Sequence, residues 1–113
     1  MNINDFIKQI CTDLKILRPK ILYKENNNGF QALYISNKKE IHLQKNTSYN
    51  YNLLFQTVIA VRYYYQDLKM TGLSTEQRTD DCLKYSQYFF DKYQQIELQF
   101  DESDEQLTKN LLK

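Results

Sequence analysis

The stretch that decides the fold runs from Tyr49 to Met70 and reads YNYNLLFQTVIAVRYYYQDLKM. It contains neither Gly nor Pro, and the residues before it, 46–48, are Asn, Thr and Ser, which cap helix N-termini. The sequence therefore predicts one long helix here. Apolar residues at the spacing i, i+4, i+7, i+11 and i+14 form a single stripe along it. These are Leu54, Val58, Val61, Tyr65 and Leu68.

The other side of this helix is apolar as well. Ile59 and Tyr63 lie roughly opposite the stripe, and Phe55 lies at its margin. From Leu53 to Val61 the helix is apolar almost all round, which is typical of a helix that is buried on two sides. One face must therefore pack on the rest of the chain, and the second is covered either by more of the chain or by a partner.

The residues before this helix predict a first helix and a small sheet. A helix is predicted over 4–17, with Asn4 as its N-cap and Leu17 on its apolar stripe, and Pro19 ends it. Three short β-prone segments follow, separated by Asn- and Gly-containing turns. They are residues 20–24, 30–36 and 40–44. Since the connections between them are short, we predict a three-stranded antiparallel meander.

The residues after the central helix predict more helix. Gly72 is the expected C′ residue. The sequence Ser-Thr-Glu-Gln from Ser74 fits a capping box for a helix that runs to about Gln95, and a second box opens a short helix over 103–112. The predicted fold is thus a single α+β domain over residues 1–113: an N-terminal helix, a three-stranded meander, two long helices and a short C-terminal helix.

Composition limits the function classes. Hydrophobic residues make up 42% and charged residues 26% of the chain, as in soluble globular proteins. With no membrane-length apolar run and no signal-peptide pattern, we expect a cytoplasmic protein. The net charge is +1, although residues 1–45 hold eight Lys or Arg against four Asp or Glu, and residues 76–113 hold five against nine. We therefore expect the chain alone to bind nucleic acid only weakly.

Few residues could support catalysis. Cys11 and Cys82 belong to no paired motif, and we expect them to be buried free thiols. His42 is the only histidine, so no Ser/His/Asp set can be argued, and the two glycines are too isolated for a phosphate-binding loop. We expect neither catalysis nor a bound metal or cofactor.

The central helix carries a family resemblance. Residues 59–66 read IAVRYYYQ. They resemble the zinc-site helix, H-E-x-R-H-x-x-Q, of small phage and plasmid zincins of the ImmA/IrrE-like and SprT-like kind. Arg62 and Gln66 are kept. Ile59 stands at the first His, Ala60 at the Glu and Tyr63 at the second His.

The resemblance implies a pseudo-metallopeptidase. A zincin needs two imidazoles one helical turn apart and a carboxylate as general base, which Ile, Ala and Tyr cannot replace. The predicted order of helix, sheet, helix and helix matches the minimal zincin core. In active relatives an acidic residue early in the next helix binds the metal. Glu76, Asp80 and Asp81 are similarly placed here, where they are expected to act only as charges favoured by the helix dipole.

The consecutive tyrosines 63–65 indicate a docking surface. Successive helical residues point about 100° apart, so the three rings cannot share one buried face. One interpretation makes them core residues with surface hydroxyls, and another stacks them on unpaired bases. We predict a protein-binding surface that includes Arg62, Tyr63 and Tyr64. Nucleic-acid contacts within a complex are predicted for Lys20, Lys24, Lys38 and Lys39.

The resemblance to zincins of mobile elements also implies a setting and a partner. It indicates a non-catalytic accessory protein of a phage, plasmid or chromosomal cassette. The partner that it suggests is a DNA polymerase with primase activity, as in a staphylococcal cassette, acting in replication of the element. The alternatives are an independent antagonist of a host defence protein and an enzyme with an unrecognised site.

Overall fold

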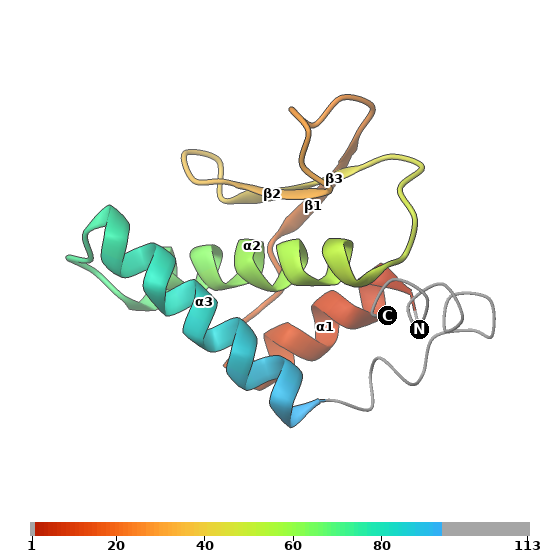
Figure 1. Ribbon diagram of the computed structural model, residues 1–113. Coiled ribbons are helices and arrows are strands. Elements are labelled where there is room, and N and C mark those ends of the chain that lie inside the picture. The colour runs from red at the N-terminus through yellow and green to blue at the C-terminus, as the bar shows by residue number, and fades with distance from the viewer. Residues whose placement is uncertain (1, 94–113) are drawn as a thin grey trace.

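The computed structural model describes residues 2–93, which form three helices and one three-stranded sheet (Figure 1). The predicted α+β class is confirmed. The predicted helix over 103–112 lies outside the described residues. The elements are α1 (Ile3–Leu14), β1 (Lys20–Lys24), β2 (Ala32–Ile35), β3 (Glu40–Gln44), α2 (Tyr51–Lys69) and α3 (Thr75–Lys92).

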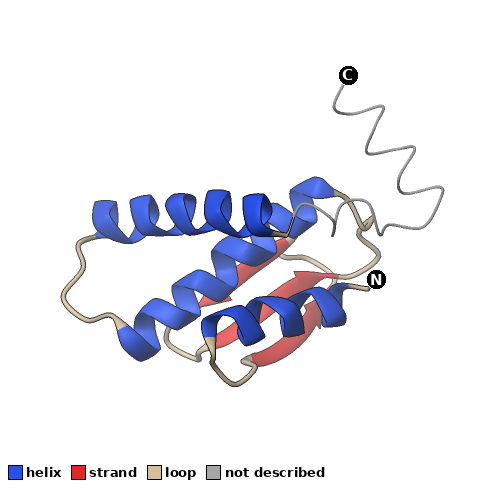
Figure 2. Cartoon of the chain, turned by 90° about the horizontal axis from the view of Figure 1, so that it is seen from below, coloured by secondary structure: helices blue, strands red, loops and turns tan. Residues whose placement is uncertain are grey.

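The elements are arranged with every described helix on one side of the sheet (Figures 1 and 2). Helix α2 lies next to the sheet, and α1 and α3 lie beyond it. In keeping with this order, α2 contacts β2, β3, α1 and α3. The central stretch is therefore buried on more than one side, as its apolar circumference predicted. No helix in the described range is both long and apolar enough to cross a bilayer.

The sheet is mixed, so the predicted antiparallel meander is wrong. Its strand order is β1-β3-β2, with β1 parallel and β2 antiparallel to β3. The segment 25–31 contains the predicted turn, with positive φ at Asn28 and Gly29, but it crosses the end of β3 instead of pairing β1 with β2. There the side chain of Asn27 donates a hydrogen bond to the carbonyl of His42 (2.8 Å), and the Asn27 N–H donates to the side chain of Gln44 (3.0 Å). This anchored crossing carries β2 to the far side of β3.

Helix α1 ends earlier than its apolar stripe predicted. Lys15 adopts the left-handed conformation (φ 58°), and the N–H of Ile16 bonds to the carbonyl of Cys11, which closes the helix. Leu17 is therefore outside the helix and 87% exposed. The N-cap is Asn2, not Asn4, and its side chain accepts a hydrogen bond from the N–H of Asp5.

Local signals set the ends of the two long helices. Asn50, rather than residues 46–48, caps α2, because its side chain accepts from the N–H of Leu53 (2.9 Å). The predicted capping box at Ser74 is confirmed at the start of α3. Gly72 has the expected positive φ (81°), but the C-cap of α2 is Met70, so Gly72 lies one residue beyond C′.

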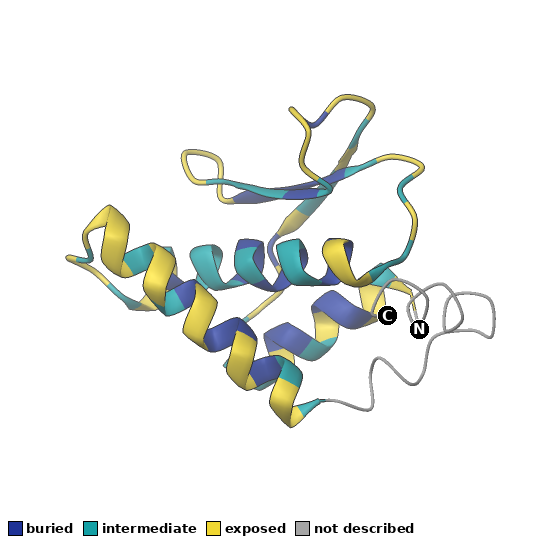
Figure 3. Cartoon of the chain, viewed as in Figure 1, coloured by how far each residue is buried: buried dark blue, intermediate teal, exposed yellow. Residues whose placement is uncertain are grey.

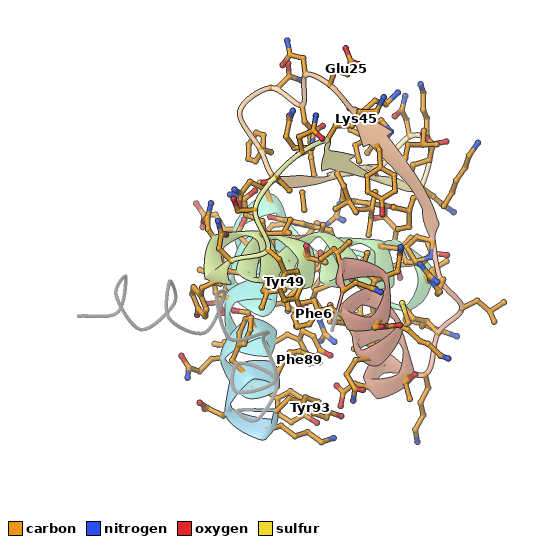
Figure 4. All side chains as sticks on the ribbon, turned by 90° about the vertical axis from the view of Figure 1, so that its right-hand side faces the viewer. Phe6, Glu25, Lys45, Tyr49, Phe89 and Tyr93 are labelled. Carbon is orange, nitrogen blue, oxygen red and sulfur yellow. The ribbon has the colours of Figure 1, made fainter. Side chains whose placement is uncertain are left out.

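The hydrophobic core joins α1, the sheet, α2 and α3. Leu54, Val58 and Val61 of the predicted stripe are fully buried, whereas Leu68 is 40% exposed. Figure 3 shows buried segments on each of the three helices. Aromatic rings fill the space between α1 and α3 (Figure 4). The Phe6 ring meets that of Phe89 edge to face, with 5.7 Å between ring centroids.

A buried carboxylate fastens α1 to α3. Asp13 accepts hydrogen bonds from the hydroxyls of Tyr85 (2.7 Å) and Tyr93 (2.8 Å) and from the ammonium of Lys92 (2.9 Å). Burial raises the pKa of Asp13, but the three hydrogen bonds and the charge of Lys92 outweigh burial and lower the pKa below its ordinary value. The charged carboxylate is thus the form that the fold stabilises.

The lowered pKa of Asp13 gives a pH-dependent prediction. Asp13→Asn should lower the free energy of unfolding by about 2 kcal/mol at pH 7, since hydrogen bonds to a charged group are lost. The folded pKa lies below the ordinary value of 3.8, so this stabilisation is complete well above pH 3.8 and is lost as the pH falls through the folded pKa.

Urea unfolding of both proteins at pH 7 and at acid pH measures the effect. The difference in free energy of unfolding between wild type and Asp13→Asn should become smaller at acid pH. An unchanged difference would contradict the role of charged Asp13 in stability. Asp91→Asn, at an exposed position of α3, is the control, and it should change the free energy of unfolding little at either pH.

Candidate partner-binding cleft

A cleft of about 410 Å³ lies between β2 and α2. We call it the β2–α2 cleft. Because β2 is an edge strand, the cleft lies at a border of the sheet. It is mostly apolar, and Phe30 at its wall is 46% exposed. Its lining residues are Phe30, Ala32, Leu33, Tyr34 and Ser36 from β2 and its flanks, Phe55, Gln56, Ile59, Ala60 and Tyr63 from α2, and Arg78 from α3.

The helical period of α2 brings Ile59, Ala60 and Tyr63 together. Ile59 and Tyr63 are one turn apart, and Ala60 adjoins them, so all three line the same cleft. These positions present an aliphatic chain, a methyl group and a phenol to the cleft.

Two sets of hydrogen bonds between α2 and the β2 segment fix the spacing of the cleft walls. Near the start of α2, the side-chain oxygen of Gln56 accepts from the N–H groups of Gln31 (2.8 Å) and Ala32 (3.2 Å). Near its end, Asp67 accepts from the hydroxyls of Tyr34 (2.5 Å) and Ser36 (2.8 Å). Since these hydrogen bonds lie toward opposite ends of α2, they hold β2 along the helix and leave the apolar middle of the cleft open.

Arg78 brings a positive charge from α3 to the cleft. Its Nε donates to the side-chain oxygen of Gln66 (2.8 Å), and its Nη2 donates to Asp67 (3.0 Å) and to the carbonyl of Tyr63 (3.3 Å). The guanidinium carbon also lies 5.2 Å from the centre of the Tyr63 ring. These contacts hold the guanidinium in one orientation.

Arg62 and Gln66, the two residues on which the predicted resemblance to the zincin helix rests, meet at one carboxylate. Arg62 donates to both oxygens of Asp81 (2.8 and 3.0 Å), and Gln66 donates to Asp81 as well (2.8 Å). The hydrogen bond from Arg62 lowers the pKa of Asp81 against the effect of burial. The guanidinium of Arg62 also lies over the rings of Tyr65 and Tyr85. Arg62, predicted as part of the partner surface, therefore lies in the α2–α3 interface and does not line the cleft.

The acidic residues considered as a third metal ligand do not reach the cleft. Asp81 is held by Arg62, Asp80 pairs with Lys84 on the exposed side of α3, and Glu76 is exposed in its first turn. Within residues 2–93 no group of three or more His, Cys, Asp or Glu side chains could hold a metal ion.

The three consecutive tyrosines point in different directions. The Tyr63 hydroxyl lies 3.3 Å from that of Thr79, the Tyr64 ring packs edge to face on Tyr34 (6.1 Å between centroids), and Tyr65 lies under Arg62. All three are half-buried. Tyr63 belongs to the cleft, whereas Tyr64 helps to attach α2 to the sheet.

His42 does not line the cleft. It is buried on β3, where its Nε2 lies 3.1 Å from Glu40 Oε1. This hydrogen bond and the nearby Lys20 lower the pKa of Glu40. The cysteines are free and buried, as predicted, and burial raises the pKa of Cys11 to about 11 and that of Cys82 to about 12, so both thiols stay protonated.

The lysines predicted to contact nucleic acid do not form one patch. Lys20 begins β1 and is paired in register with Glu40, beside the turn that holds Lys38 and Lys39. Lys24 ends β1 and lies at the opposite end of the sheet. Three of the four lysines thus share one end of the sheet, away from the fourth.

Sequence reasoning missed the strand side of the cleft and Arg78. The alternation of β2 was a usable signal, because residues two apart share a face of a sheet. It would have placed Ala32 and Tyr34 together. No comparable signal marked Arg78, whose position depends on how α3 packs on α2. Comparison with protein-family models, with curated proteins and with solved structures found no match.

Proposed function

We propose that this chain is a non-catalytic accessory protein that binds a larger protein through the β2–α2 cleft. The observation that carries the proposal is the chemistry of the cleft. At the positions that align with the zinc ligands and general base of zincins, it presents Ile59, Ala60 and Tyr63. A half-exposed aromatic residue, Phe30, stands on the opposite wall. Such an apolar hollow favours the burial of a partner's side chain.

The partner that we propose is a DNA polymerase or primase of a mobile genetic element. Its support is the resemblance of the central helix to zincins of such elements, together with a net charge of +1, which leaves DNA binding to the partner. A fold whose catalytic residues are replaced keeps its scaffold when the surface serves another use. The chain would then act as a subunit of the replication complex.

Capture of the partner with a matched pair of variants tests the proposal. Tyr63→Ala removes a ring from the cleft, and truncation of a central interface tyrosine typically costs ~2 kcal/mol, a roughly thirtyfold loss of affinity. Leu83→Ala removes an apolar side chain that is 49% exposed on α3 and does not line the cleft.

The tagged chain would be used to capture its partner from the native host, mass spectrometry would identify the partner, and titration would measure the affinity of each variant. Tyr63→Ala should bind about thirtyfold more weakly and Leu83→Ala normally. Normal binding by folded Tyr63→Ala would place the interface elsewhere, and capture of a host defence protein without a polymerase would support the antagonist function instead.

A further inference from the structure

Arg78 has hydrogen-bond donors that the fold does not use. A guanidinium carries five N–H donors. Within the described part of the chain, Nε and Nη2 of Arg78 donate to Gln66, Asp67 and the carbonyl of Tyr63, but Nη1 has no acceptor. The side chain is 28% exposed and lines the β2–α2 cleft. Two oriented donors are therefore available beside the apolar walls.

The charge around these donors favours an anion. Asp67, the nearest carboxylate to Arg78, already accepts from Tyr34, Ser36 and Arg78. Burial raises the pKa of Asp67, but the hydrogen bonds from Tyr34 and Ser36 and the charges of Arg78 and Lys39 lower it below its ordinary value. The charged groups identified near this end of the cleft are thus two cations and one hydrogen-bonded carboxylate, which leaves a net positive charge for a ligand.

We infer that the cleft selects a partner segment in which a large apolar side chain lies next to an Asp or Glu. The apolar side chain would occupy the space between Phe30 and Ile59, and the carboxylate would accept hydrogen bonds from Nη1 of Arg78. This inference rests on the proposed function and adds the chemistry of the ligand to it. Arg suits this task because its planar fork fixes the direction of its donors.

Three small probes of equal length test the inference without knowledge of the partner: 4-phenylbutyrate, 4-phenylbutanamide and 4-phenylbutylamine. Each is titrated into the ¹⁵N-labelled full chain and followed by the amide signals of Phe55, Ile59 and Tyr63. The carboxylate should bind about tenfold more tightly than the neutral amide, since a charge-assisted hydrogen bond is roughly twice as strong as a neutral one. The amine should bind more weakly still.

Variants then assign the selectivity to Arg78. Arg78→Lys keeps the charge but loses the fork, so the preference for carboxylate over amide should fall to about threefold or less. Lys84→Met, which removes an exposed cation of the same helix, should keep the tenfold preference. If Arg78→Lys does not fold, the comparison of the three probes on the wild-type chain still shows whether the cleft prefers a carboxylate.

The inference is overturned if the carboxylate and the amide bind the wild-type chain equally, or if no probe shifts the signals of cleft residues. These outcomes differ from a failure of the proposed function, which appears as normal partner capture by Tyr63→Ala. Equal binding of the carboxylate and the amide, with partner capture lost in Tyr63→Ala, would leave the cleft as a purely apolar docking site.

Discussion

Replacement of Asp81 by Ala should lower the free energy of unfolding by about 3 kcal/mol, because removal of one partner from a largely desolvated ion pair leaves the other charge uncompensated. Arg62, whose side chain is only 15% exposed, bonds to both carboxylate oxygens of Asp81. Gln66, which is 1% exposed, would also lose an acceptor. The variant therefore leaves the partly buried guanidinium of Arg62 without its carboxylate partner at the α2–α3 interface, whereas Gln66 keeps its hydrogen bonds with Arg78.

Asp80→Ala is the matched control. Asp80 is the neighbouring residue, and its ion pair with Lys84 is exposed to solvent, where ion pairs contribute little. Denaturant unfolding of the two variants should therefore give clearly different midpoints. Equal, small losses for both would show that the Arg62–Asp81 pair does not hold α3 against α2. The outcome also concerns function, since the packing of α3 places Arg78 at the cleft.

Local signals were sufficient to predict the helices from sequence. Helical periodicity and the capping box at Ser74 depend on residues a few positions apart, so α2 and α3 appear where they were predicted. The end of α1 was missed because Lys15 takes a left-handed conformation that is usual for Gly. The sheet order was missed because it depends on the contact between Asn27 and β3, which lie far apart in sequence.

The residues of the candidate site likewise fall into those that local spacing could predict and those that depend on tertiary contacts. The positions on one helix, Ile59, Ala60 and Tyr63, could be assigned to one face from spacing alone, and the structure brings them together in one cleft. Arg62 could not be placed correctly, because its direction depends on Asp81 of another helix. Arg78 was missed for the same reason: its contacts with Gln66 and Asp67 are tertiary.

Phe89→Ala should cause the largest loss of stability, about 4 kcal/mol. Removal of a fully buried aromatic ring loses the transfer free energy of the ring and leaves a cavity. Phe89 has no exposed surface, and its ring contacts those of Phe6, Tyr85 and Tyr93. Small domains are stable by only about 5–15 kcal/mol, so the variant should unfold at a much lower denaturant concentration.

Leu83→Ala, at an exposed position of the same helix, is the control and should change the free energy of unfolding by less than about 1 kcal/mol. Phe89 does not line the cleft, so the folded fraction of Phe89→Ala should bind the partner with unchanged affinity. A loss of stability together with a weaker affinity of the folded protein would show that the α1–α3 core and the β2–α2 cleft are coupled. Unchanged affinity would show that the core stabilises the scaffold and that the cleft alone determines binding.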